Sequence, residues 1–154
     1  MFRTKELRRF HTFAFPDYPG GLYVTSGVSG SRPGYVTACA WAALLLNGQN
    51  GFVDGCRQVV STTRYIAERL VKIPGLVLLC PTAETTVIPF TSQVFDIYQL
   101  MKNCGKRGFL LNPLQFPCGV HLGVTMEHAK PGVADQFLAV VREEAELLQL
   151  RSFF

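Results

Sequence analysis

The sequence has few charged residues for its length. Of its 154 residues, 17% are charged and 48% are hydrophobic. So little charge leaves part of the surface of a folded domain apolar, and we expect another domain, a partner or a second subunit to cover it. The hydrophobic fraction excludes a disordered chain. The length is sufficient for one domain with a substantial core.

Grouped metal ligands and paired cysteines are missing as well. The five cysteines are widely spaced and include no Cys-x-x-Cys pair, and the three histidines are dispersed. A zinc site or a disulfide framework needs closer or even-numbered grouping. We therefore predict no metal site and interpret the cysteines as small apolar residues. They are Cys39, Cys56, Cys80, Cys104 and Cys118.

Long apolar runs and basic stripes are also lacking. The longest apolar run, Ala38 to Leu46, is well short of the roughly 20 residues that a membrane-spanning helix needs. The net charge of +4 is mild, and four of the fifteen basic residues lie within the first nine positions. No basic stripe with interleaved aromatic residues follows them. The sequence therefore predicts neither a membrane span nor a nucleic-acid partner.

Hydrophobic periodicity predicts an α+β unit. Segment 10–15 could be a strand, and segment 16–34 is rich in glycine and predicts a long irregular loop. Beyond it, helical and β-type patterns alternate in a way that suits helices packed on one face of a small antiparallel sheet. The expected helices are 35–46, 52–72, 95–104 and 132–150, and the expected strands are 76–80, 85–90, 109–111 and 120–126.

One short segment has the composition of an anion-binding site. Gly30, Ser31, Arg32, Pro33 and Gly34 stand directly before the first predicted helix of the α+β unit. Backbone N–H groups, the positive end of the helix dipole, a hydroxyl and a guanidinium would converge there. The alternative from the residues alone is an ordinary loop in which Ser31 caps the helix.

The same segment carries a family resemblance. The stretch from Tyr18 to Ala43 resembles the sphingosine-1-phosphate lyases, pyridoxal-phosphate enzymes related to the group II amino-acid decarboxylases. Gly-Gly-Leu-Tyr, which ends at Tyr23, is followed by Gly-Ser-Arg-Pro-Gly. The resemblance continues through Phe95 to Tyr98 and Leu111 to Pro117, and covers nearly the whole chain.

The resemblance implies a fold and roles for individual residues. The chain would be the C-terminal part of a fold-type I pyridoxal-phosphate-dependent enzyme, mainly its small domain. Residues 1–34 would end the large cofactor-binding domain, and residues 35–154 would form the linking helix and the small domain. Ser31, with Gly30 and Arg32 beside it, would contact the cofactor phosphate in the neighbouring subunit. Tyr23 would line the path of the substrate to the cofactor.

The chain departs from the family at the catalytic lysine. The family's Schiff-base lysine lies in a His-Lys motif upstream of the matched region, and this sequence contains no His-Lys pair. We therefore expect no catalytic residue in this chain. His121 in a β-type run and His128 in a loop are interpreted as structural, and Glu143 as part of a solvated helix face.

The function implied is that of a fragment. The complete protein would be a carbon–carbon lyase that cleaves a phosphorylated sphingoid base to a fatty aldehyde and phosphoethanolamine, and the chain alone would be inactive. It would pair as a homodimer or with a full-length lyase subunit. The full-length family implies the cytosolic face of the endoplasmic reticulum membrane, and the fragment alone a cytoplasmic location. The alternatives are a non-catalytic truncated paralogue that modulates a lyase, and a fragment of a related amino-acid decarboxylase.

Overall fold

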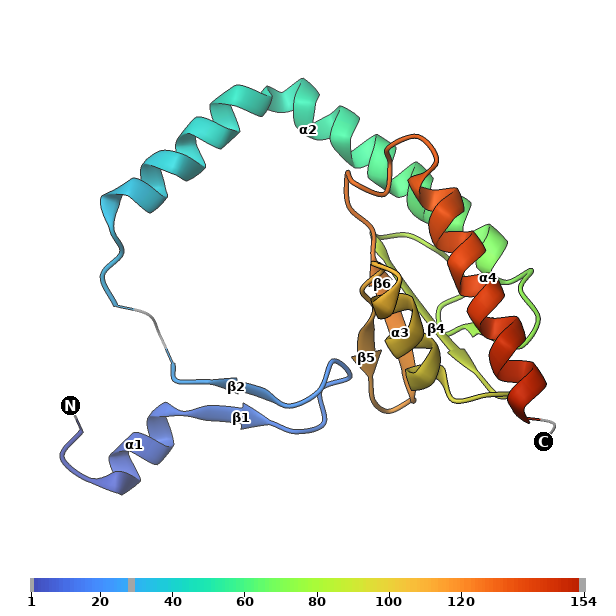
Figure 1. Cartoon of the computed structure of the whole chain (residues 1–154). Coiled ribbons are helices and arrows are strands. Elements are labelled where there is room, and N and C mark those ends of the chain that lie inside the picture. Colours follow the sequence, from blue (N-terminus) through green and yellow to red (C-terminus); the bar gives the residue numbers. More distant parts are fainter. Residues whose placement is uncertain (1, 28–29, 153–154) are drawn as a thin grey trace.

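The computed structural model describes residues 2–27 and 30–152. It contains a hairpin near the N-terminus, a long kinked helix, and a small α+β domain (Figure 1). In chain order the elements are α1 (Lys5–His11), β1 (Phe13–Phe15), β2 (Tyr23–Thr25), α2 (Gly34–Leu70), β3 (Leu76–Leu78), β4 (Val87–Ser92), α3 (Ile97–Lys106), β5 (Asn112–Leu114), β6 (Gly119–Gly123) and α4 (Val133–Ser152).

The small domain is built on a four-stranded antiparallel sheet in the order β3-β4-β6-β5. Alternate residues of the two central strands, Ile88 and Phe90 on β4 and Val120 and Leu122 on β6, are buried. The second half of α2 contacts β3 and β4, α3 contacts β5 and β6, and α4 packs on both helices. The helices therefore cover one face of the sheet, as the sequence predicts.

The core lies entirely within the small domain. Every residue of the hydrophobic core cluster comes from Val59 or later in the chain. The second half of α2 contributes Ile66, Ala67 and Leu70, while α4 contributes Phe137 and Val141, both fully buried. At roughly 1.5–3 kcal/mol for each large apolar side chain removed from water, this cluster is the main source of stability.

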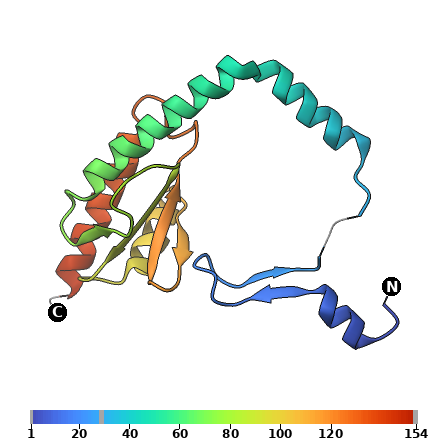
Figure 2. The same cartoon turned by 180° about the vertical axis from the view of Figure 1, so that it is seen from behind.

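Helix α2 is bent at Gly48, which has φ 58° and ψ −176° inside an otherwise helical run. Glycine is the residue that tolerates such a backbone conformation, because it has no Cβ. The two helices expected at 35–46 and 52–72 are therefore both present, and they meet at this kink as the two halves of α2. In Figures 1 and 2 the first half leaves the small domain and arches over to the N-terminal hairpin.

Two predictions in the N-terminal part are wrong in detail. Segment 10–15 was expected to be a strand, but α1 extends to His11 and only Phe13–Phe15 form β1. Segment 16–34 was expected to be irregular, yet it contains β2, which pairs antiparallel with β1. The hairpin has only three pairs of facing residues, and strands so short leave little periodic signal in a sequence.

The strand expected at 109–111 is also misplaced. The structure puts β5 at Asn112–Leu114, where it pairs with β6. Phe109 instead packs edge-on against Phe137 of α4, with 5.5 Å between the ring centroids. The apolar run 109–111 therefore predicts a strand, but its first residue, Phe109, packs against helix α4.

Candidate cofactor and substrate site

The segment before α2 offers an exposed set of anion-binding donors. The N-cap of α2 is Pro33, and no side chain caps the helix. The alternative interpretation of Ser31 as the N-cap is therefore wrong, and its exposed hydroxyl is not used by the helix. The first turn of α2 carries no acidic residue. The leading N–H groups of the helix and the positive end of its dipole thus face the side from which the chain enters.

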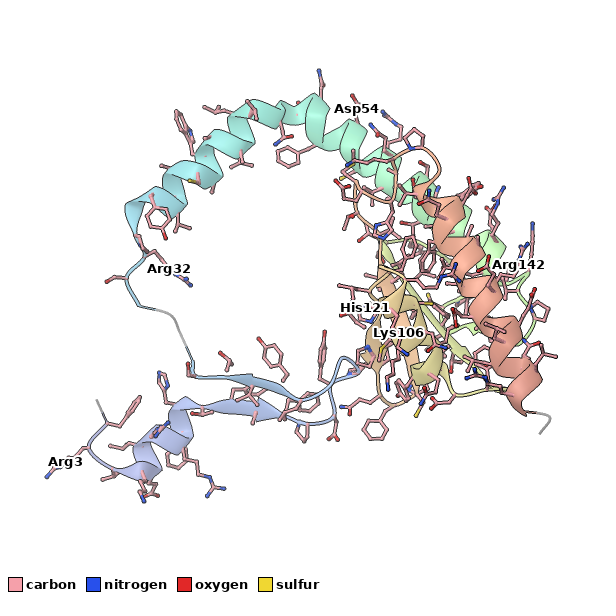
Figure 3. All side chains as sticks on the ribbon, viewed as in Figure 1. Arg3, Arg32, Asp54, Lys106, His121 and Arg142 are labelled. Atoms are coloured by element: carbon pink, nitrogen blue, oxygen red, sulfur yellow. The ribbon has the colours of Figure 1, made fainter. Side chains whose placement is uncertain are left out.

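Arg32 adds a full positive charge to this set. Among residues 2–27 and 30–152, no carboxylate lies within ion-pair distance of its guanidinium. Figure 3 shows Arg32 at the start of α2, across the arc from His121 and Lys106 of the small domain. A hydroxyl, a guanidinium and a helix N-terminus together form a donor set that suits a phosphate group.

Tyr23 lies in an aromatic cluster on the hairpin. It is the first residue of β2 and faces Phe15 of β1 in the pairing register. Its ring meets those of Phe13 and Tyr18 edge-on, with centroid separations of 6.3 and 6.0 Å. Half of the Tyr23 side chain remains accessible. The cluster therefore presents an apolar wall that carries phenol hydroxyls.

The turn of the hairpin is docked on the small domain by one glutamine. The Gln115 side-chain amide donates hydrogen bonds to the carbonyl oxygens of Pro16 at 2.8 Å and Tyr18 at 2.9 Å. Its backbone N–H donates to the carbonyl of Pro19 at 2.8 Å. The hairpin tip beside β5 is visible in both orientations of the molecule (Figures 1 and 2).

A hollow of about 200 Å³ lies at this junction. Tyr98 lines it and donates a hydrogen bond of 2.6 Å to the carbonyl of Leu114. Its interaction with the Cys118 side chain, together with burial, raises the pKa of the Tyr98 phenol. The hydroxyl therefore remains a donor at neutral pH. The hollow is lined by Gly20, Gly21, Tyr98, Pro113, Leu114 and Gln115.

Of the two histidines of the small domain, His128 has a hydrogen-bond partner, whereas the buried Nδ1 of His121 has none among the described residues. His121 lies on β6 between Pro89 of β4 and Asn112 of β5, and its buried Nδ1 has no hydrogen-bond partner in the described part of the chain. His128 accepts a hydrogen bond from the backbone N–H of Thr125 at 3.1 Å, and burial lowers its pKa.

Some charged residues of the small domain form ion pairs with one another. Lys130 is bound to Glu127 at 2.6 Å. Arg107 at the end of α3 contacts Glu143 at 2.6 Å and Glu144 at 3.5 Å on α4. Glu143 is exposed, as predicted for a solvated helix face, and its carboxylate pairs with Arg107 and not with a second carboxylate.

A second hollow, of about 480 Å³, lies between α2 and the β3–β4 connection. It contains none of the residues that the sequence singles out. Its lining combines apolar side chains with three charged ones, Arg64, Glu68 and Glu84. In the segments 2–27 and 30–152, no three His, Cys, Asp or Glu residues are grouped so that they could hold a metal ion. No helix of these segments is both long and apolar enough to span a bilayer.

The structure brings together only some of the predicted residues. Gly30, Ser31 and Arg32 form one continuous segment, and Tyr23 lies on the hairpin that precedes it. Sequence reasoning assigned no role to Gln115, since no local pattern marks it. Its partners are 97 and 99 residues away in the chain.

Comparison with known proteins relates this chain to one group of enzymes. No family model matches the sequence. The sphingosine-1-phosphate lyase of Drosophila melanogaster is 42% identical over 134 residues, which is 86% of this chain and 24% of that protein. Sphingosine-1-phosphate lyase 1 of Rattus norvegicus is 36% identical over 143 residues, or 93% of this chain and 25% of that protein. The chain therefore spans about a quarter of the length of these curated relatives.

Solved structures agree with the sequence comparison. The sphingosine-1-phosphate lyase of Burkholderia pseudomallei superimposes with a TM-score of 0.71 at 34% identity, covering 99% of this chain and 35% of that one. A glutamate decarboxylase of Lactobacillus brevis superimposes with a TM-score of 0.64 over 92% of this chain and 34% of that one. At 17% identity the decarboxylase shows a shared fold alone. The fold corresponds to the C-terminal part of a fold-type I pyridoxal-phosphate-dependent enzyme.

Proposed function

Because this chain is related over most of its length to the C-terminal part of the sphingosine-1-phosphate lyases, we propose that it supplies one wall of a lyase active site. The complete enzyme would cleave a phosphorylated sphingoid base to a fatty aldehyde and phosphoethanolamine. The observation that carries the proposal is the exposed Ser31 hydroxyl, free of a capping role and next to Arg32, at the start of a helix.

The residues present fit the phosphate of pyridoxal phosphate, but not the rest of the cofactor. Ser31, the backbone N–H of Gly30 and Arg32 would hold the phosphate together with the first turn of α2. When bound, the cofactor would supply an electron sink for the electrons of the broken carbon–carbon bond. The Schiff-base lysine has no counterpart in this sequence, since it contains no His-Lys pair. The lysine would come from another part of the complete protein or from a partner subunit.

Tyr23 would line the substrate path. Its ring is held by Phe13 and Tyr18 through edge-on contacts, so that it presents apolar surface with a hydroxyl at its rim. A long-chain base with a polar head suits such a wall, since the chain needs apolar contact and the head group needs donors.

The division into domains follows the same proposal. Residues 1–34 would belong to the large cofactor-binding domain, and residues 35–154 to the linking helix and the small domain. The burial pattern supports a separation of the N-terminal hairpin from the small domain, because the core draws only on residues from Val59 onward. The hairpin and the first half of α2 contribute nothing to it.

A partner would cover the first half of α2. Trp41, Leu44, Leu45 and Leu46 are all exposed there, and Leu46 is 90% accessible. Apolar surface of this kind, contiguous along a helix, is typical of an interface. We propose a homodimer, or pairing with a full-length lyase subunit, with Ser31 reaching the active site of the neighbouring subunit. The complete enzyme would act at the cytosolic face of the endoplasmic reticulum membrane.

A chimeric enzyme tests this function. This chain would replace the matching quarter of the Drosophila melanogaster lyase, and aldehyde release from a phosphorylated sphingoid base would be measured. We expect an active chimera and no turnover by the isolated chain with added cofactor. Ser31→Ala should weaken cofactor binding roughly 10- to 100-fold, because a hydrogen bond to a charged group is lost. Ser26→Ala, an exposed serine of the same region, is the matched control.

Two results would contradict the proposal. Turnover by the isolated chain would show that a lysine outside the family motif can serve as the Schiff-base lysine. A folded chimera with unchanged cofactor affinity after Ser31→Ala would exclude the phosphate contact. Mass and peptide mapping of the native protein would add an independent check, since a longer product with a His-Lys peptide is expected.

One alternative function rests on a specific observation. The absence of a His-Lys pair also suits a non-catalytic paralogue that binds a full-length lyase through the exposed face of α2 and modulates it. Co-purification of the native chain with a full-length subunit, together with a native mass that matches 154 residues, would favour this modulator. The related decarboxylase is disfavoured by sequence, because the decarboxylase similarity is one of fold at 17% identity.

A further inference from the structure

The N-terminal hairpin has little of its own to hold it in place. Its strands share three pairs of facing residues, and the rings of Phe13, Phe15, Tyr18 and Tyr23 are 44–56% exposed. A two-stranded hairpin of this size is at best marginally stable in water. The orientation of Tyr18 and Tyr23 therefore depends on what the turn between the strands contacts.

The turn contacts Gln115. Three carbonyl oxygens of the turn, those of Pro16, Tyr18 and Pro19, accept hydrogen bonds from the side chain and the backbone of this one residue. Gln115 follows β5 directly, and β5 is paired with the central strand β6. Among the described residues, the hydrogen bonds between the small domain and this turn all come from Gln115.

The geometry requires a primary amide. The side-chain nitrogen carries two N–H donors, and each serves a different carbonyl, at 2.8 and 2.9 Å. Glutamate has nearly the same shape but no donor when ionised, and it would place its charge against two carbonyl oxygens. Asparagine is one methylene shorter.

We propose that Gln115 is a positioning residue that fixes the substrate-path wall of Tyr18 and Tyr23 to the small domain. The proposal rests on the function proposed above, because that function makes these rings a substrate wall. The Tyr18 carbonyl that Gln115 holds also accepts a hydrogen bond from Gly21 N–H at 2.9 Å. Holding it fixes the Tyr18 ring, and the Tyr18 ring contacts Tyr23 at 6.0 Å. Any displacement of the small domain is transmitted to the wall.

Hydrogen exchange of the 154-residue chain is the first test, with Gln115→Ala and Gln115→Glu compared with Gln99→Ala, an exposed glutamine of α3. We expect amides of the hairpin, residues 13–25, to exchange about thirtyfold faster in both Gln115 variants, because the two lost hydrogen bonds contribute about 2 kcal/mol together. Amides of β6 should keep wild-type protection, and Gln99→Ala should change neither segment. Unchanged hairpin protection in both Gln115 variants would overturn the proposal, and so would a loss confined to Gln115→Ala, because it would indicate packing instead of donation.

Kinetics in the lyase chimera separate the two proposals. Gln115→Glu should raise KM for the phosphorylated sphingoid base about tenfold and leave cofactor affinity unchanged, whereas Ser31→Ala should weaken the cofactor. An inactive chimera with a loosened hairpin would refute the lyase function and leave the docking role intact. An active chimera with a loosened hairpin and an unchanged KM would overturn the link between Gln115 and the substrate path.

Discussion

The side-chain amide of Gln115 donates a hydrogen bond of 2.9 Å to the carbonyl of Tyr18, although 97 residues separate them in the chain. Between them run β2, all of the kinked helix α2, most of the sheet and α3. Figures 1 and 3 show α2 leaving the small domain and the N-terminal hairpin returning to it, so that these segments form an arc. The bond joins the hairpin turn to the small domain at the end of this arc. The hairpin turn and the end of β5 therefore meet at Gln115, whose three hydrogen bonds reach the carbonyls of Pro16, Tyr18 and Pro19.

The stability of the small domain should depend on the buried face of β4. Phe90→Ala removes a fully buried ring from the core and leaves a cavity, so we expect a loss of about 3–5 kcal/mol in the free energy of unfolding. Val87→Ala, at an exposed position of the same strand, should change it by no more than about 0.5 kcal/mol. Urea unfolding of the isolated chain measures both. Equal losses in the two variants would contradict the assignment of the buried face.

The kink of α2 should depend on glycine at position 48. Gly48→Ala meets nothing within 4 Å, yet its φ of +58° is unfavourable for a side chain. We expect the helix to straighten at this point, because both flanking segments are already helical. Small-angle X-ray scattering should then show a longer maximum dimension.

Gly55→Ala is the matched control for the kink. Gly55 lies in the same helix, and its added Cβ would have only Met126 Sδ nearby, at 3.9 Å. This variant should keep the overall shape and gain roughly 0.5–1 kcal/mol in stability, from the higher helix propensity of alanine. An unchanged scattering profile for Gly48→Ala would show that contacts other than the glycine backbone set the bend.

The free energy of unfolding should fall on acidification because of His128, which lies in the loop before α4. Burial lowers the pKa of His128 below its ordinary value of about 6.5, and the charge of Glu127 acts in the opposite direction. The unfolded chain therefore binds a proton at a higher pH than the folded one. The stabilisation is complete above about pH 6.5 and is lost as the pH falls through the lower pKa of the folded state.

Denaturant unfolding at several pH values between about 5 and 7.5 measures this dependence. His128→Ala should flatten it. Glu127→Gln should steepen it, because it removes the charge that favours the protonated ring and leaves Lys130 without its carboxylate. A slope that is the same in all three proteins would assign the pH dependence to other groups.

The five cysteines should differ sharply in reactivity. Burial, followed by the charge of Glu144, raises the pKa of the Cys104 thiol to about 11, so that about one molecule in a thousand carries the thiolate at pH 8. The other four cysteines are exposed. Iodoacetamide should modify those four in the folded chain and reach Cys104 only in concentrated guanidinium. Peptide mass spectrometry reads out each site, and alkylation of native Cys104 at the rate of Cys118 would contradict its burial.

Much of the small domain could be predicted from the sequence, because its signals are local. The amphipathic period of α4, the acid at Asp96 that caps α3 through its bond to the Tyr98 N–H, and the alternation along β4 each act within a few residues. Gly48 likewise marks the point where two helical patterns meet, since glycine tolerates a backbone that other residues avoid. Gly-Gly-Leu-Tyr followed by Gly-Ser-Arg-Pro-Gly indicates the lyase relationship, which the comparisons confirm.

The tertiary structure decided what the local pattern leaves open. Only the fold shows that Pro33, not Ser31, caps α2, which leaves the Ser31 hydroxyl available. Only the fold shows that β5 is formed by Asn112–Leu114 and that Phe109 packs against Phe137 of α4. The docking of the hairpin by Gln115 depends on the placement of two segments that are far apart in sequence. A short-range pattern carries no trace of such a contact, because both partners are ordinary polar groups until the chain brings them together.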